Sequence, residues 1–191
     1  SEVLADWLKE LGYTHCFYLN GGNNMHLVQS CNKRFICVPF IHEVSAGISA
    51  EYFNEASSSK KAFALVTAGP GLTNIVTAIA GAHLESRELL VIGGQVKTTD
   101  LTTRQLRQRG IQEIPGKDIV KPITLNSEVM KATWSKKKFN DFVFFKKNSR
   151  KGSKFLEIPI DIQGKDFVDL NKLFKKQKSK KFEIKKNKLN Y

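Results

Sequence analysis

A repeated alternation of apolar runs and glycine-containing turns constrains most strongly what this chain can fold into. The run "KAFALVT" (61–67) is followed by "AGPG", by the apolar helical segment "LTNIVTAIAGAHLES" (72–86) and by a second apolar run, "ELLVIGG" (88–94). Strands that are apolar on both faces and alternate with helices are typical of a parallel sheet covered on both sides. The pattern therefore predicts an α/β fold, a doubly wound and mostly parallel sheet with helices on both faces.

The remainder of the chain extends this alternation. Further strands are expected at residues 14–19, 34–41 and 155–162, and further helices at residues 1–11, 24–31 and 43–56. Ser1 suits the N-cap of the first helix and Gly12 suits its C′ position. The polar residues 101–120 predict a loop or a broken helix.

Apolar content falls after Gly164, where lysines dominate. We therefore expect one globular domain over residues 1–164 and a lysine-rich linker or tail over residues 165–191. A chain of 191 residues with 41% apolar composition is long enough for one well-formed core.

The net charge of +13 comes from 31 basic residues against 18 acidic ones. The excess is concentrated after residue 135, in lysine runs such as "SKKKF" and "LFKKQKSKKFEIKKNK" that contain no identifiable nucleic-acid-binding motif. Such runs are mostly solvated surface. The distribution disfavours a nucleic-acid partner, although a binding patch for an acidic partner stays open.

Three cysteines, Cys16, Cys31 and Cys37, occur without CxxC spacing. This arrangement disfavours a zinc site or a disulfide framework and favours reduced, buried thiols. No uninterrupted run of about 18 apolar residues occurs, so we expect no membrane span. The N-terminus has no signal-peptide pattern, and a cytoplasmic location is the default expectation.

Unusual residues follow four of the expected strands: "NGGNN", "HE", "TAGPG" and "GGQ". In open α/β sheets, ligands bind at the carboxyl ends of the strands, so these residues are expected to converge on one edge. The "GPG" at 69–71 would allow close backbone approach and could receive an anion at a helix N-terminus. A tight strand-to-helix turn is the alternative. The motif matches neither GxGxxG nor a P-loop, which disfavours dinucleotide binding.

Glu43 is a carboxylate in an unusual setting. It follows the apolar run 35–41 and opens a segment rich in small residues. Apolar runs of this kind are usually buried strands, so we expect the carboxylate to be desolvated. The alternative is an acidic residue stabilised by the dipole of a helix N-terminus.

Three separated stretches, "IHEVSAGISAEYF", "ALVTAGPGLTNIVTAIAGAHLESRELLVIGGQ" and "FLEIPIDIQG", closely resemble the N-terminal pyrimidine-binding domain of thiamine diphosphate enzymes. The resemblance covers about residues 1–164 and is strongest to the acetolactate synthase group. It implies a thiamine diphosphate-dependent carboligase of 2-keto acids. It also implies that Glu43 hydrogen-bonds N1′ of the cofactor's aminopyrimidine and favours the imino tautomer that removes the thiazolium C2 proton.

The same resemblance implies further site residues. Those expected to bind the cofactor, besides Glu43, are Gly21, Gly22, Gly69, Pro70, Gly71 and Asn74. Gln95 and Gln112 are expected at the substrate pocket, with a structural role equally open for each. Ile111 stands where the family has an aromatic residue. The stretch "QRGIQEIPGKDIVKPIT" also resembles acetolactate synthase-like proteins of cell-surface sugar pathways, which keeps a sugar or an unusual keto acid open as substrate.

The family holds Mg²⁺ and the cofactor's diphosphate with a "GDG" motif on another domain, and no such motif occurs in these 191 residues. The resemblance thus implies Mg²⁺ ligands on a missing domain, an optional FAD, and a second subunit that completes the active site of a homodimer or homotetramer. The small residues after Glu43 would let that subunit pack close. By itself the chain is expected to be inactive. Two alternatives are a subunit of a split 2-keto acid decarboxylase and a non-catalytic assembly protein whose basic tail binds an acidic partner.

Overall fold

The computed structural model describes residues 1–102 and 106–166 and contains a six-stranded sheet in the order β2-β1-β3-β4-β6-β5. The strands are β1 (Tyr13–Tyr18), β2 (Ile36–Pro39), β3 (Lys61–Val66), β4 (Leu89–Gln95), β5 (Asn126–Val129) and β6 (Ser153–Pro159). All neighbouring strands in it pair in parallel. The predicted α/β sheet is confirmed, and it is parallel throughout the described part of the chain.

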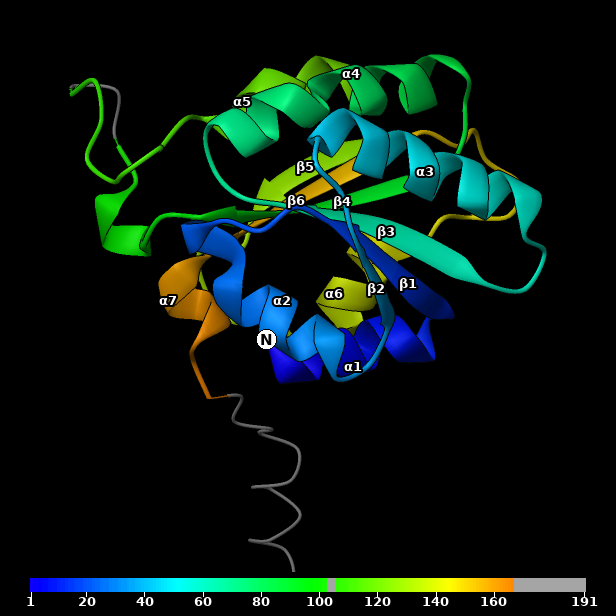
Figure 1. The fold of residues 1–191 in the computed structure, drawn as a ribbon, viewed down its shortest axis with the longest axis horizontal. Coiled ribbons are helices and arrows are strands. Elements are labelled where there is room, and N and C mark those ends of the chain that lie inside the picture. Colours follow the sequence, from blue (N-terminus) through cyan, green and yellow to red (C-terminus); the bar gives the residue numbers. More distant parts are fainter. Residues whose placement is uncertain (103–105, 167–191) are drawn as a thin grey trace, which may run out of the picture.

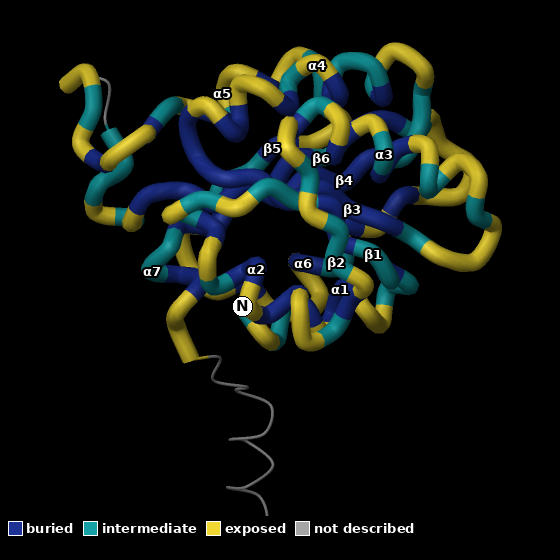
Figure 2. Tube along the Cα trace, in the orientation of Figure 1, coloured by how far each residue is buried: buried dark blue, intermediate teal, exposed yellow. Residues whose placement is uncertain are grey.

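Helices cover both faces of this sheet (Figure 1). One face carries α1 (Glu2–Glu10), α2 (Met25–Asn32), α6 (Lys136–Val143) and α7 (Ile160–Gln163), and the other carries α3 (Glu43–Ala56), α4 (Pro70–Leu84) and α5 (Gly116–Val120). Short 3₁₀ turns lie at Gly22–Asn24 (η1), Thr98–Asp100 (η2) and Lys121–Ile123 (η3). Figure 2 shows the buried central strands between helices whose outer surfaces are exposed.

Alternating side chains of the central strands supply two hydrophobic cores. On β3, Phe63 and Leu65 pack toward α1 and α2, whereas Ala64 and Val66 pack toward α3 and α4. Successive side chains of a strand point to opposite faces, so a strand with helices on both sides must be apolar at every position. This requirement explains the continuous apolar runs in the sequence.

The small residues of α3 serve contacts within the chain. A Cβ atom added to Gly47 would lie only 2.5 Å from the Cβ of Ala78 on α4. Ala46 and Ala50 are likewise buried in the core that α3 and α4 share. Ala46, Gly47 and Ala50 are therefore used for packing against α4, while Ser45 is exposed, and the expectation of a neighbouring subunit at this helix stays a prediction.

Two parts of the fold differ from the sequence prediction. The last strand ends at Pro159 instead of continuing to residue 162, and Ile160–Gln163 form the short helix α7. The strand β5 was not predicted, because its sequence "NSEV" is polar. It lies at the sheet edge, where it pairs with β6 and Ser127 Oγ donates a hydrogen bond to the carbonyl of Lys117 (3.1 Å).

Helix α6 was also missed, although its sequence carries ordinary helix signals. Ser135 Oγ accepts a hydrogen bond from the backbone N of Lys138 (3.2 Å), as an N-cap does. Phe139, Phe142 and Val143 follow at helical spacing and are buried. The surrounding lysines obscured this pattern in the sequence.

The domain boundary at residue 164 stays a prediction. Helix α7 ends at Gln163, and the described part of the chain continues only to residue 166. Most of the predicted lysine-rich tail, residues 167–191, lies outside the described residues. In the part of the chain that the structure describes, no helix is both long and apolar enough to cross a membrane.

Candidate functional site at the carboxyl edge of the sheet

A topological switch point lies between the adjacent strands β1 and β3. The chain leaves β1 toward α2 on one face, and leaves β3 toward α4 on the other face. Connections that diverge in this way open a crevice at the carboxyl ends of the two strands, where α/β domains bind ligands. The turns after β1 and β3 therefore form the edge of the sheet at which a ligand is expected.

Thr67, directly after β3, packs these two turns against each other. A Cβ added to Gly21 would lie 2.5 Å from the Thr67 side chain. The Thr67 hydroxyl also accepts a hydrogen bond from the backbone N of Asn23 (3.3 Å). The Thr67 side chain therefore leaves no room for a side chain at position 21, whereas a Cβ on Gly22 would meet open space. Sequence reasoning missed Thr67, although its place between a buried strand and "AGPG" was visible.

A buried asparagine organises the turn after β1. The Asn24 side-chain oxygen accepts from the backbone N of Gly21 (2.9 Å), and its amide donates to the carbonyl of Leu19 (3.0 Å). The backbone carbonyl of Asn23 sits over Gly94 of β4, where an added Cβ would be 2.0 Å from that oxygen. Gly94 therefore allows this turn to lie directly on the sheet.

Glu43 is the first residue of α3 and is only 5% exposed. Asn74 Nδ2 donates a hydrogen bond to Glu43 Oε2 (2.9 Å). A Cβ added to Gly71 would stand 3.2 Å from Glu43 Oε1 and 2.9 Å from Thr67 Cγ2. The structure thus brings Glu43, Gly71 and Asn74 together, with Thr67 linking them to Gly21.

The "GPG" turn joins this group to a second segment. Gly69 has φ +65°, a conformation that favours glycine, and an added Cβ would lie 2.7 Å from the carbonyl oxygen of Gln112. Gln112, itself at φ +62°, is exposed beside this turn. Pro70 occupies the first turn of α4 and is exposed. The backbone of Gln112 therefore lies against the same turn that positions Gly71.

Gln95 belongs to a different group of contacts. Its side chain is buried, and Nε2 donates to Glu157 Oε1 (2.7 Å) and to the carbonyl of Ile114 (3.1 Å). A cavity of about 520 Å³ is lined by Gln95, Glu113, Lys117 and Glu157, a volume within the range of about 300–1,000 Å³ for small-ligand pockets. The structure thus places Gln95 beside Glu157 and this cavity.

Three carboxylates hold the polar segment that follows β4. Asp161 accepts from the backbone N (2.9 Å) and hydroxyl (2.6 Å) of Thr98. Glu113 accepts from the backbone N of Thr102 and of Arg109 (3.0 Å). Glu157 Oε2 accepts from the backbone N of Lys117 (3.1 Å). These carboxylates therefore satisfy backbone N–H groups of a segment that has little regular secondary structure.

Glu157 makes folding stability depend on pH. Burial raises its pKa from 4.5 to about 7, against the lowering effect of its hydrogen bonds from Lys117 and Gln95. Between those values the folded state holds a proton that the unfolded state has released. The free energy of unfolding should therefore fall by about 1–3 kcal/mol as pH rises from 4.5 to 7. Above pH 7, titration of Glu157 should change it little further.

Urea unfolding at pH 5 and pH 8 measures this fall. In Glu157→Gln the difference between the two pH values should shrink by most of that amount. An unchanged difference would assign the pH dependence to other groups.

Asn74 offers a test of the Glu43 contact without disturbing the core. Asn74→Asp replaces the amide donor by a carboxylate that repels Glu43. Loss of a hydrogen bond to a charged group costs about 1.5–3 kcal/mol, so we expect thiamine diphosphate, the cofactor that the resemblance implies, to bind the complete protein about tenfold or more weakly. The matched control is Thr77→Asp, which adds the same charge one turn further along the exposed side of α4. Equal losses in both variants would mean a general charge effect.

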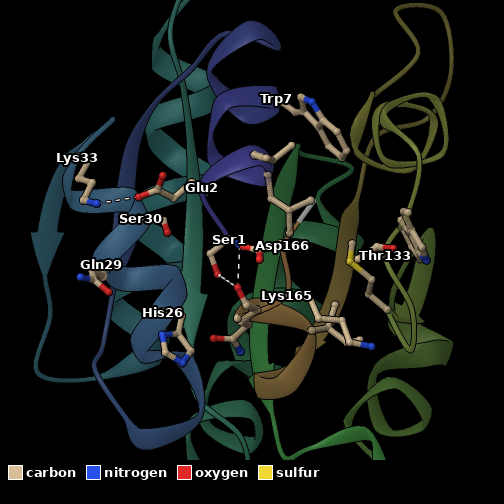
Figure 3. Close-up of a pocket in the computed structure, with 17 residues that line it drawn as sticks. Ser1, Glu2, Trp7, His26, Gln29, Ser30, Lys33, Thr133, Lys165 and Asp166 are labelled. Atoms are coloured by element: carbon tan, nitrogen blue, oxygen red, sulfur yellow. Dashed lines mark hydrogen bonds and ion pairs between the residues drawn. The ribbon is translucent and has the colours of Figure 1, made fainter. Parts of the chain in front are cut away.

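A separate cavity of about 360 Å³ lies among α1, α2 and α7, on the face of the sheet that these helices cover (Figure 3). Ser1 Oγ donates to the carbonyl of Gln163 (2.8 Å), and Lys33 pairs with Glu2 (2.7 Å) at its rim. The first residue of the sequence and the last described residues, 165 and 166, form part of this rim. We therefore assign it no ligand.

The switch point between β1 and β3, with a buried carboxylate near it, is the feature at which doubly wound α/β domains bind ligands. Comparison with known proteins gives the family. The sequence model described as "Thiamine pyrophosphate enzyme, N-terminal TPP binding domain" matches residues 1–120. The chain belongs to this family and corresponds to the N-terminal domain of acetolactate synthase-like enzymes.

Several curated relatives agree with this assignment. The chain is similar to the acetolactate synthase large subunit of Lactococcus lactis, with 30% identity over 175 residues, 90% of this chain and 29% of that protein. It is 28% identical to acetolactate synthase 2, chloroplastic, of Zea mays over 166 residues, 85% of this chain and 25% of that protein. It is 36% identical to 2-hydroxyacyl-CoA lyase 2 of Danio rerio over 124 residues, 64% and 19% respectively. The chain thus spans less than a third of the length of these relatives.

The residues at the switch point suit the pyrimidine end of thiamine diphosphate. Gly71 has no side chain between its backbone and Glu43 Oε1, and the buried carboxylate has an amide, Asn74, as its hydrogen-bond donor. Among the described residues, no group of three or more histidine, cysteine, aspartate or glutamate side chains is placed to hold a metal ion.

Proposed function

We propose that this chain is the pyrimidine-binding part of a thiamine diphosphate-dependent carboligase of 2-keto acids. The observation that carries the proposal is the position of Glu43, which is buried at the carboxyl edge of the sheet between the Asn74 amide and Gly71. Family membership supports the choice of cofactor.

In this proposal the described residues have separate tasks. Glu43 exchanges a proton with N1′ of the aminopyrimidine, Asn74 fixes the orientation of the carboxyl group, and the glycines at 21, 69 and 71 let the turns around Glu43 pack closely against Thr67 and Gln112. Bound thiamine diphosphate would supply the carbon that adds to the keto group and accepts the electrons released on decarboxylation. Gln112, beside the Gly69 turn, would contact substrate, whereas Gln95 would support the segment at residues 113–117.

A second subunit would complete the site, in a homodimer or homotetramer. Support comes from exposed apolar side chains on α3 and in the segment just before it. Ile41, two residues before Glu43, is 99% exposed, and Ile48 and Tyr52 of α3 are exposed as well; Ile111, next to Gln112, is 83% exposed. Large exposed apolar patches mark protein interfaces.

Other parts of the proposal concern the longer protein. Mg²⁺ and the diphosphate would be held by another domain, with FAD as an optional further cofactor. The cytoplasmic location expected from the sequence stays a prediction, since the plant relatives are named as chloroplastic. The split decarboxylase and the non-catalytic assembly protein also remain as alternatives.

One specific observation favours a second candidate reaction. The 2-hydroxyacyl-CoA lyase of Danio rerio has the higher identity, 36% against 30% for the Lactococcus lactis synthase, although over a shorter match. A carbon–carbon lyase that acts on an acyl-CoA would use the same Glu43 function with a different substrate.

Turnover measurements on the complete protein test both candidates. The protein is supplied with thiamine diphosphate and Mg²⁺ and is offered pyruvate, longer 2-keto acids and a 2-hydroxyacyl-CoA in separate assays. We expect cofactor-dependent release of CO₂ from a 2-keto acid, and none from the isolated chain. Cleavage of the acyl-CoA alone would replace the carboligase by the lyase, and no binding of thiamine diphosphate would overturn both.

A further inference from the structure

Three thiols meet beneath the edge strand β2, away from the switch point. Cys16 on β1 and Cys37 on β2 are direct partners in the parallel ladder, so their side chains leave the same face of the sheet. Cys31 on α2 packs in the same core on that face. Cys37 packs against the core that contains Cys16 and Cys31.

These thiols differ in burial and acidity. Cys16 is completely buried and Cys31 nearly so, whereas Cys37 is partly exposed on the edge strand. The hydrogen bond from Cys16 lowers the pKa of Cys37, and burial raises the pKa of Cys16. Of the two paired thiols, the more accessible Cys37 thus also ionises more readily than Cys16, and the thiolate is the form that oxidants attack.

We propose that Cys37 is an oxidation site for hydroperoxides, and that Cys16 resolves the oxidised form as a disulfide. Paired positions on neighbouring strands lie about 4.7–4.9 Å apart, within the range of about 4.4–6.8 Å between the Cα atoms of a disulfide. Cys16 is the direct neighbour of Cys37 in the ladder, while Cys31 approaches from the helix. The proposal is independent of the proposed function.

The chemistry has two balanced steps. The Cys37 thiolate attacks hydrogen peroxide, the O–O bond breaks, and the released hydroxide takes up a proton, which leaves Cys37 as a sulfenic acid and one water. The Cys16 sulfur then attacks the Cys37 sulfur and the S–O bond breaks. The leaving hydroxide takes the Cys16 proton as a second water. The peroxide accepts two electrons and one disulfide forms.

Peptide mapping of the complete protein tests this pairing. The protein is treated with an equimolar amount of hydrogen peroxide, free thiols are alkylated, and trypsin followed by chymotrypsin separates Cys16 from Cys31. We expect a Cys16–Cys37 cross-link that dithiothreitol reverses. A Cys31–Cys37 link, oxidation that stops at Cys37 in the wild-type protein, or no oxidation of Cys37 would each overturn the proposal.

Single substitutions separate the roles of the three thiols. Cys16→Ala should abolish the cross-link and raise trapping of a Cys37 sulfenic acid by dimedone several-fold, while Cys31→Ser should leave the cross-link intact. Because Cys16 is in the core, the half-exposed Cys37→Ser provides a second test, and it should remove both the cross-link and the dimedone adduct. A dimedone adduct on Cys16 or Cys31 in that variant would contradict the assignment.

Discussion

Glu43→Gln in the complete protein is expected to lower turnover of 2-keto acid by about 10²–10⁴-fold, the usual contribution of a positioned proton-exchanging group. Glutamine has nearly the same shape and can still accept from Asn74 Nδ2, so the contact at 2.9 Å need not be lost. It cannot exchange a proton with the aminopyrimidine. Steady-state kinetics with saturating cofactor measures the effect, and folding should change little.

Glu51→Gln is the matched control for this substitution. Glu51 is a second buried glutamate on α3, two turns further on, and it pairs with Arg87 (3.2 Å) rather than facing the switch point. We expect this variant to lose some stability and to keep most of its turnover. Retention of full activity by Glu43→Gln, or similar losses in both variants, would remove Glu43 from the mechanism.

Gly94→Ala is expected to have the largest effect on stability, a loss of about 3 kcal/mol or more, since overpacking costs about 1–3 kcal/mol even where side chains can move. The new Cβ would stand 2.0 Å from the carbonyl oxygen of Asn23, which is backbone and cannot rotate away. The turn at residues 20–24 would have to lift from β4. Urea unfolding of the variant measures the loss, and cofactor affinity should fall with it because that turn carries Gly21.

Gly81→Ala provides the opposite control. Gly81 lies on α4, and a Cβ there meets no atom within 4 Å. Replacing a helical glycine by alanine then stabilises the fold by about 0.5–1 kcal/mol. A Gly94→Ala variant as stable as Gly81→Ala would show that the turn after β1 does not rest on the sheet as described.

Much of the fold was readable from the sequence because the central strands have to be apolar on both faces. Strands β3 and β4 and helix α4 form one uninterrupted signal of this kind. The signal weakens toward the edge of the sheet. Strand β5 is polar and depends on its pairing with β6, and α7 replaces the predicted end of β6 because the chain turns after Pro159. Local sequence carries little information about either event.

The candidate site was only partly visible in the sequence. The resemblance pointed to Glu43, Gly71 and Asn74, and the structure brings these three together. It could not indicate that Thr67 packs the turn after β1 against the turn after β3. Thr67 and Gly21 are 46 positions apart in the sequence and come into contact only in the folded chain. Likewise, the contact between Gln95 and Glu157 depends on the pairing of β4 with β6.

A structure of the complete protein with bound thiamine diphosphate tests the central claim most directly. The measurement is the distance from the Glu43 carboxyl oxygens to N1′ of the aminopyrimidine. The account predicts a hydrogen bond of about 2.6–3.2 Å, the reach needed for proton exchange, with the ring beside Gly71. An aminopyrimidine bound elsewhere, or a Glu43 carboxyl group that contacts only protein atoms, would contradict it.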